Sequence, residues 1–275
     1  MICLVTGATS GIGMATAQAL SAAGATTIIV VRDTAKGAVS VGEIRRTTGS
    51  DRVEMCVSDL SSQKSTRTLA KEFTREHDRL DVLVNCAGAF FRERRVTVDG
   101  IEMTFALNHL AYFFLTTLLL DSLKQSGSAR VLNVTAPATT KNDFDDLQGE
   151  RRYRPFTAFG ASKVANLMFT FELARRLAGT GVTANAVHPG RVRSNLMRDA
   201  PAPFRLATRL VSGPAERAGR RNRKAGDVPA IRARGRSFLT RREGDPGERP
   251  GYGCVAPTPA LAGERSPDGL ETGPD

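Results

Sequence analysis

The sequence contains no tryptophan, only three tyrosines and three histidines, and four cysteines among its 275 residues. The cysteines are Cys3, Cys56, Cys86 and Cys254, and no two of them form a CxxC pair. Disulfide frameworks and zinc sites use closely and regularly spaced cysteines, so neither is expected here. The composition predicts a protein without a metal site that works in the reducing cytoplasm.

Long apolar runs are also absent. The longest candidate, Ala111 to Leu120, has about half of the roughly 20 residues that a membrane-spanning helix needs, and it contains threonines. The first residues, Met1 to Gly7, carry no basic segment and no cleavage site of the kind that marks a signal peptide. We therefore expect a cytoplasmic protein with no membrane partner.

Basic residues outnumber acidic ones, which gives a formal net charge of +11 and a pI of about 10.1. Such a balance is found in proteins that bind nucleic acids or phosphorylated ligands. The basic residues are not gathered into a patch with interleaved aromatic side chains, however. We expect no nucleic-acid partner, since a solvated basic surface and a phosphate-bearing cofactor explain the charge more simply.

The chain changes character near Pro214. Before this residue, apolar strands alternate with helix-length segments, whereas Gly, Pro and Arg dominate after it. Such a composition buries too little apolar area to offset the entropy lost on ordering. We therefore expect one domain over residues 1–213 and a tail over residues 214–275 that is either a poorly ordered extension or the product of a shifted reading frame.

The alternation of Val-, Ile- and Leu-rich strands with helices predicts an α/β fold. Strands of this composition are buried on both faces, and right-handed crossovers then give a doubly wound parallel sheet, the Rossmann arrangement. The expected strands are 2–5, 26–31, 52–57, 81–85, 129–135 and 183–187, and the expected helices are 11–23, 35–48, 63–77, 108–125 and 158–178.

A glycine-rich turn follows the first expected strand and opens the first expected helix. Glycine permits a tight turn and the close approach of a pyrophosphate, and the helix N-terminus offers free N–H groups and a positive dipole. A second strand about 20 residues further on completes the pattern of a dinucleotide site. The residues predicted to bind the phosphates are Gly7, Thr9, Ser10, Gly11, Ile12 and Gly13.

The end of the second expected strand distinguishes NAD from NADP. An acidic residue there binds the ribose 2′-hydroxyl of NAD, whereas an arginine accommodates the 2′-phosphate of NADP. The strand is followed by Arg32 and then Asp33. Because a guanidinium grips phosphate through two parallel hydrogen bonds, Arg32 favours NADP over NAD. The alternative is that Arg32 is a surface residue at a strand end and that Asp33 caps the next helix.

Several motifs together resemble the short-chain dehydrogenase/reductase family, and in particular its retinol-dehydrogenase-like branch. Thr6 to Gly13 matches the TGxxxGIG motif, Asn85 to Gly88 matches NNAG, and His188 to Ser194 matches the segment that holds the nicotinamide carboxamide. The resemblance covers residues 1–213. It implies further cofactor contacts at Asp59, Leu60, Asn85, Ala87, Gly88, Lys163, Pro189, Gly190 and Val192.

The same resemblance places a catalytic tetrad of Asn, Ser, Tyr and Lys. Asn108 and Lys163 match two of its members. The tyrosine position, four residues before the lysine, is Phe159, and the serine position near the end of the fifth strand is Ala136. In the family the lysine lowers the pKa of the phenol, which exchanges a proton with the substrate, and a phenyl ring has no such proton.

Two functions therefore remain open. One is an NADP-preferring oxidoreductase that transfers a hydride on a carbonyl or alcohol substrate and uses an unusual proton source, such as the substrate or water. The other is a catalytically silent dinucleotide-binding protein that acts as a sensor or a scaffold. Fold-level kinship supports the first function by analogy, while Phe159 and Ala136 support the second.

The remaining candidates have ordinary structural interpretations. Tyr153 lies ten residues before Lys163, on a loop expected to border the substrate pocket, and does not fit the family spacing. His109 is expected to be packed within its helix. The family also implies a homodimer in which the helices at 108–125 and 158–178 pair across a two-fold axis.

Overall fold

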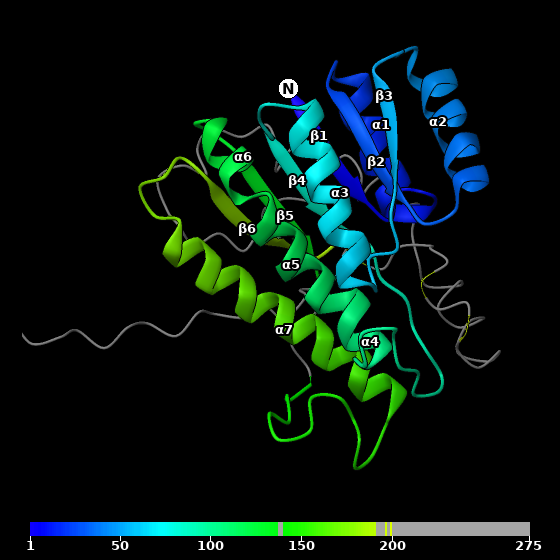
Figure 1. Cartoon of the computed structure of the whole chain (residues 1–275), viewed down its shortest axis with the longest axis vertical. Helices are drawn as coiled ribbons and strands as arrows, with labels where there is room; N and C mark the ends of the chain where they lie inside the picture. The colour runs from blue at the N-terminus through cyan, green and yellow to red at the C-terminus, as the bar shows by residue number, and fades with distance from the viewer. Residues whose placement is uncertain (137–139, 191–195, 197–198, 200–275) are drawn as a thin grey trace, which may run out of the picture.

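The structure is a computed structural model, which describes residues 1–136, 140–190, 196 and 199. All six strands run parallel in one sheet, in the order β3-β2-β1-β4-β5-β6, and helices cover both of its faces (Figure 1). The prediction of a doubly wound sheet is therefore confirmed. The tail at 214–275 lies outside the described residues. The strands are β1 (Ile2–Thr6), β2 (Thr26–Val31), β3 (Val53–Val57), β4 (Val82–Asn85), β5 (Arg130–Val134) and β6 (Thr183–Val187).

The helices follow the predicted order, but two starts differ by more than two residues, and the helix predicted over 108–125 is interrupted at Leu119. The helix predicted from Asn108 begins at Met103, because the Glu102 carboxylate accepts hydrogen bonds from the N–H groups of the next turn. The last long helix begins at Pro155, since proline suits a first helical turn. The helical elements are α1 (Gly11–Ala22), α2 (Thr34–Thr48), α3 (Gln63–Glu76), α4 (Met103–Phe105), the π-helical turn η1 (Ala106–Leu110), α5 (Ala111–Leu118), α6 (Leu120–Gln125) and α7 (Pro155–Arg176).

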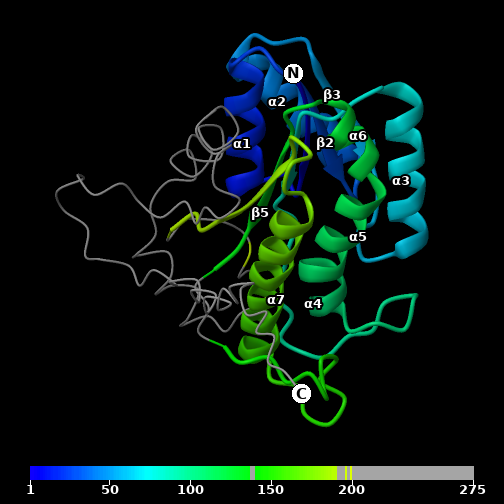
Figure 2. The same ribbon diagram turned by 90° about the vertical axis from the view of Figure 1, so that its left-hand side faces the viewer.

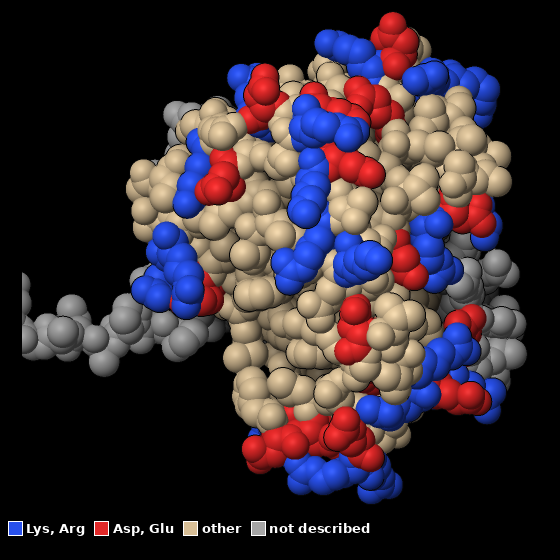
Figure 3. Space-filling model, viewed as in Figure 1, with Lys and Arg blue, Asp and Glu red and all other residues tan. Residues whose placement is uncertain are grey.

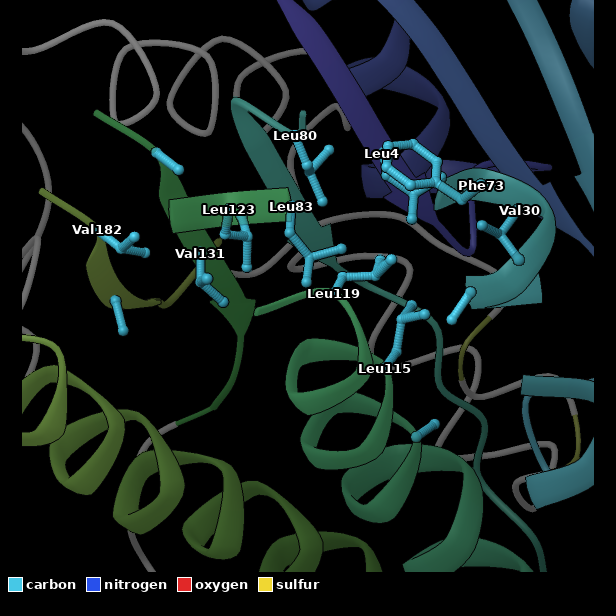
Figure 4. Close-up of a cluster of buried hydrophobic side chains, with 14 of the residues drawn as sticks. Leu4, Val30, Phe73, Leu80, Leu83, Leu115, Leu119, Leu123, Val131 and Val182 are labelled. Carbon is cyan, nitrogen blue, oxygen red and sulfur yellow. The ribbon is translucent and has the colours of Figure 1, made fainter. Parts of the chain in front are cut away.

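Alternate residues of each strand feed two separate cores. In β1, Leu4 faces the side covered by α3, α5, α6 and α7, whereas Cys3 and Val5 face α1 and α2. Figure 2 shows α1 and α3 on opposite sides of the sheet. The larger core, on the Leu4 side, includes Phe73 of α3 and Leu115 of α5 (Figure 4). Within the described ranges, no helix combines the length and the hydrophobicity needed to cross a membrane.

The strand order reverses between β1 and β4. The chain builds outward from β1 to β3, then returns to place β4 against the other edge of β1. The loops after β1 and β4 leave the sheet in opposite directions, which opens a crevice at the carboxyl ends of the strands. This topology fixes where a ligand site forms.

A chain of buried polar side chains ties the sheet to α7. The Asn85 amide of β4 donates to the hydroxyl of Thr116 in α5 (3.0 Å) and to the amide oxygen of Asn133 in β5 (2.8 Å). Asn133 in turn donates to the hydroxyl of Thr170 in α7 (2.9 Å), which donates to the carbonyl oxygen of Asn166 (2.6 Å). All five residues are buried, so each of these bonds forms away from competing water.

We predict that Asn133→Ala destabilises the fold by about 2–4 kcal/mol, because the change leaves the Asn85 amide and the Thr170 hydroxyl with one partner fewer in a buried site. Urea denaturation followed by circular dichroism measures the free energy of unfolding. Gln125→Ala, which removes an exposed amide at the end of α6, is the control and should change stability by less than about 0.5 kcal/mol. Equal effects of the two substitutions would contradict a role for the buried chain.

Candidate active site

A cleft of about 400 Å³ opens at the crevice between the loops that follow β1 and β4. Segments after all six strands contribute to its lining, and α7 supplies two side chains from its first half. Its size is within the range of small-molecule and cofactor sites. The predicted residues that line it are Gly7, Thr9, Ser10, Ile12, Gly13, Arg32, Asp59, Leu60, Ala87, Gly88, Ala136, Phe159, Lys163, Pro189 and Gly190.

Four predicted residues are not among those lining the cleft. Gly11 is the first residue of α1, and Val192 lies outside the described residues. Asn85 is fully buried in the polar chain between the sheet and the helices. Asn108 is also fully buried, and its side chain contacts the backbone beneath the cleft.

Two positions of the first turn exclude any side chain. Gly7 has a φ of +68°, and a Cβ placed there would lie 2.8 Å from the Cα of Ala87. A Cβ on Gly13 would overlap the Gly7 carbonyl oxygen, so glycine allows α1 to pack directly against the turn. The Ser10 side chain makes no capping hydrogen bond at the start of α1. The first N–H groups of α1 are consequently open to an anionic ligand.

Thr6 joins the two loops that form the crevice. Its hydroxyl oxygen accepts hydrogen bonds from the N–H groups of Cys86 (2.9 Å) and Ala87 (3.0 Å), and its proton is donated to the carbonyl oxygen of Val84 (3.3 Å). The sequence analysis placed Thr6 in the motif but gave it no role. Its position at the last residue of a buried strand, directly before Gly7, was the available signal.

The part of the cleft beside the end of β2 is lined by Arg32 but not by Asp33. The Asp33 carboxylate accepts from the N–H of Lys36 at 3.0 Å, and this hydrogen bond lowers the pKa of the carboxyl group. Asp33 therefore caps α2, as predicted. Arg32 is exposed and lines the cleft, and no carboxylate of the described residues forms a salt bridge with its guanidinium.

Lys163 is buried on α7 at the inner wall of the cleft. Its Nζ donates to the carbonyl oxygen of Val134 at 3.3 Å and lies over two aromatic rings, 5.2 Å from the centroid of Tyr112 and 5.9 Å from that of Phe159. Burial lowers the pKa of Lys163 to about 8, because a charged ammonium loses its hydration there. The amine therefore changes its protonation state near pH 8 rather than near the ordinary value of 10.5.

Asn108 supports the loop after β4. Its side-chain oxygen accepts from the N–H of Ala89 (2.9 Å), and its amide donates to the carbonyl oxygen of the same residue (3.0 Å). The backbone oxygen of Asn108 accepts from the amide of Asn166 on α7 (2.8 Å). Asn108 thus fixes Gly88 and Ala89 against η1 and α7, which positions one wall of the cleft.

The positions that would carry the family's phenol and hydroxyl are apolar. Phe159 and Ala136 both line the cleft, and the hydroxyl of the neighbouring Thr135 is committed to the carbonyl oxygen of Lys163 at 2.9 Å. The Phe159 ring packs near that of Phe90, with 6.2 Å between centroids. The wall formed by residues 136 and 159 therefore offers no side-chain proton to a substrate.

The other ionisable candidates lie in different places. His109 is packed as expected: its Nδ1 is 3.0 Å from the amide oxygen of Asn166, and burial lowers its pKa. The Tyr153 hydroxyl is 3.0 Å from the Thr104 hydroxyl and does not line the cleft. His188 does line it. Among the described residues, no three His, Cys, Asp or Glu side chains lie close enough together to hold a metal ion.

Tyr112 is the residue that sequence reasoning overlooked. It is almost completely buried on α5, one turn after Asn108, and its ring lies beneath the Lys163 ammonium. Its spacing from Asn108 could have indicated this position, because residues four apart on a helix share one face. The sequence assigned no role to Tyr112, which does not fit the spacing of the family's tyrosine and lysine.

The model of the short chain dehydrogenase family matches residues 1–203. Retinol dehydrogenase 12 of mouse is 46% identical over 200 residues, and retinol dehydrogenase 11 of human is 45% identical over 199. Each match covers 72% of this chain and 63% of the relative, so the chain spans less than two thirds of these proteins.

Solved structures lead to the same family. The complex of RhlG from Pseudomonas aeruginosa with NADP in its active site has a TM-score of 0.68 and 28% identity, and the match covers 85% of this chain and 92% of that one. The fold described above is thus shared with this solved structure. The chain belongs to the short-chain dehydrogenase/reductase family, in its retinol-dehydrogenase-like branch.

Proposed function

We propose that the chain is an oxidoreductase that binds NADP in preference to NAD and interconverts a carbonyl and an alcohol, with a proton source other than tyrosine. The observation that carries the proposal is the cleft itself, in which the glycine turn, Arg32 and Lys163 share one continuous lining. The retinol dehydrogenases in its family support redox chemistry.

The residues present fit a dinucleotide. The missing side chains at Gly7 and Gly13 bring bare backbone to the cleft, and the open N–H groups of α1 suit a pyrophosphate. Lys163 has two N–H groups beyond the one bonded to Val134, which suit ribose hydroxyls. When bound, the cofactor supplies or removes a hydride. The chain's own residues would hold it, beside an apolar wall formed by the half-buried Phe159 and Ala136.

The preference for NADP rests on Arg32. Its guanidinium is not held in an ion pair by any described carboxylate, and the neighbouring acidic residue, Asp33, is occupied at the start of α2. A free guanidinium binds a phosphate dianion through charge-assisted hydrogen bonds, whereas it gains little from a ribose hydroxyl.

We predict that Arg32→Ala weakens NADPH binding by about 10- to 100-fold, the effect of losing charged hydrogen bonds, and changes NADH binding by less than threefold. Fluorescence titration with each cofactor measures the two dissociation constants. Arg46→Ala, an exposed arginine at the far end of α2, is the matched control and should alter neither. A preference for NADPH that survives Arg32→Ala would refute the role assigned to Arg32.

A silent dinucleotide-binding protein, acting as a sensor or scaffold, is the second candidate function. It is favoured by one specific feature, the apolar wall made by Ala136 and Phe159. Loss of a positioned acid or base lowers rates by about a hundred- to ten-thousandfold. Incubation with NADPH and a panel of carbonyl compounds distinguishes the candidates, since cofactor binding without turnover would leave only the silent function.

We predict that Phe159→Tyr combined with Ala136→Ser raises carbonyl reduction by about 10²- to 10⁴-fold, because the pair restores a phenol beside Lys163 and a hydroxyl opposite it. Steady-state oxidation of NADPH measures the change. Phe156→Tyr is the matched control: it adds the same hydroxyl one turn earlier on α7, at a residue that does not line the cleft, and should leave the rate unchanged. An equal gain in the control would mean that the hydroxyl does not act in the cleft.

We also propose that α5 and α7 pair with the same helices of a second copy. Their outer face exposes Phe113 (45%), Met168 (47%) and Phe171 (39%), and Figure 3 shows a broad uncharged area over these helices. Contiguous exposed apolar side chains of this kind are typical of protein interfaces.

Phe113→Asp should therefore convert a dimer into a monomer, because it places an unpaired charge within the apolar face. Sedimentation velocity at micromolar concentration measures the mass. Val98→Asp is the control, since Val98 is exposed on a loop outside this face. A monomeric wild-type protein would rule out the pairing.

A further inference from the structure

The catalytic end of the cleft holds few groups that can carry a proton. Arg32 and Asp59 line the cleft beside β2 and β3, at the ribose end. The other ionisable residues in the described lining are Cys86, Lys163 and His188. Of these three, Lys163 shares its helix with Phe159, where the family's proton donor would stand. An ionisable proton source at this end of the described lining therefore belongs to these three residues.

The Lys163 ammonium has more N–H donors than its hydrogen bond to Val134 uses. Its Nζ has three N–H groups, and the carbonyl oxygen of Val134 accepts from one of them. Nζ also lies close to the bare backbone of Gly88, where an added Cβ would be 3.7 Å away. Nζ therefore lies beside Gly88 and Phe159, which both line the cleft.

Aromatic rings, rather than carboxylates, surround this charge. The Tyr112 ring of α5 and the Phe159 ring of α7 both lie within 6 Å of Nζ. The ionisable groups that act on it from other elements are Cys86, after β4, and His109, in η1. Burial raises the pKa of Cys86 to about 11, so its thiol is neutral at physiological pH and does not hold the lysine in its charged form.

Tyr112 contributes its ring and not its hydroxyl. The ring centroid is 5.2 Å from Nζ, the range of a cation–π contact. The Tyr112 hydroxyl is buried and finds no hydrogen-bond partner among the described residues. Because the hydroxyl has no such partner, the contact between Tyr112 and Lys163 is made by the ring alone.

We propose that the ammonium of Lys163 itself exchanges the proton with the substrate oxygen, and that the ring of Tyr112 is the positioning group that holds the ammonium in place. This inference rests on the proposed oxidoreductase function and names the proton source of that function. In the reducing direction, an N–H bond of Lys163 breaks and an O–H bond forms on the carbonyl oxygen. A bound reduced nicotinamide would supply the hydride that the carbonyl carbon gains, and the neutral amine would regain a proton from water.

The sign of the pH dependence follows from this chemistry. Reduction needs the ammonium, so it is fastest below the pKa of Lys163 and falls as the pH rises through about 8. Oxidation needs the neutral amine and rises over the same range. A tyrosine of ordinary pKa, near 10, would give no such inflection.

The first test is the pH profile of kcat and kcat/KM for carbonyl reduction with saturating NADPH, from pH 6 to 9.5. Wild-type protein should show a single fall near pH 8. Tyr112→Leu should move this fall to lower pH by roughly 0.5–1 unit, because the ammonium loses a cation–π contact. Tyr112→Phe, which keeps a ring and removes only the hydroxyl, should restore the wild-type profile.

Lys163→Arg keeps a positive charge but cannot release a proton near pH 8, so it should lower kcat by more than about 100-fold. His188→Asn should leave the inflection near pH 8 in place. A profile unmoved by Tyr112→Leu, undiminished turnover in Lys163→Arg, or loss of the inflection in His188→Asn would each overturn the inference. Absence of turnover in the wild-type protein would overturn the proposed oxidoreductase function itself. The three results above require turnover in the wild-type protein, so they would overturn only the role assigned to Lys163 and Tyr112.

A second readout does not involve activity. Burial favours the neutral amine, so the folded chain releases the Lys163 proton near pH 8, whereas the unfolded chain keeps it up to the ordinary value of 10.5. Wild-type protein should therefore gain thermal stability relative to Lys163→Met as the pH rises from about 8 to about 10.5, by roughly 5–10 °C in Tm. A difference in Tm that is constant with pH would contradict a titrating Lys163.

Discussion

The hydroxyl of Thr6 is the contact on which the cleft depends. It accepts from two consecutive backbone N–H groups after β4 and donates within that strand, so the end of β1 and the following loop of β4 are held as one unit. Parallel sheets open at such a reversal of strand order, but an opening alone does not make a site. The bare backbone of Gly7 is placed against Ala87 by this arrangement, and the two walls of the crevice keep a fixed separation.

The second constraint is the cost of burying an amine. An ammonium removed from water is tolerated only where other groups replace its hydration. Around Lys163 those groups are a carbonyl oxygen and two ring faces, which stabilise the charge incompletely. The phenol of the family's tyrosine is missing from this environment, because Phe159 stands in its place. The lysine that lowers the pKa of that phenol in the family is still present as Lys163. The site combines a well-built cofactor cleft with an amine whose protonation state is finely balanced.

The fold could be predicted from the sequence because its signals are local. Strand and helix periods, the glycine turn and the family motifs each lie within a few residues. The boundaries at Met103 and Pro155 could not, because they depend on a buried carboxylate cap and on a proline that starts a helix after an irregular loop. The NADP preference, the homodimer and the roles of the cleft residues remain predictions.

Tyr112 and Thr6 show why part of the site was missed. The partner of Tyr112 lies 51 residues away in the chain and those of Thr6 lie 78 to 81 residues away, and no local pattern encodes such separations. Tyr112 reads as one more apolar residue of a helix until α7 is brought against it. The composition of residues 214–275 predicts disorder, but that segment lies outside the described residues.

The chain of buried polar side chains between the sheet and α7 affects which residue changes in the cleft can occur during evolution. Residues 159, 163, 166 and 170 recur at intervals of four, three and four, which puts them on one face of α7. Because Asn166 and Thr170 clamp the rotation of that helix, whatever occupies position 159 faces the cleft. Phenylalanine and tyrosine codons differ by one base. The scaffold therefore lets an acid–base group be lost or regained in one mutational step, with no backbone remodelling.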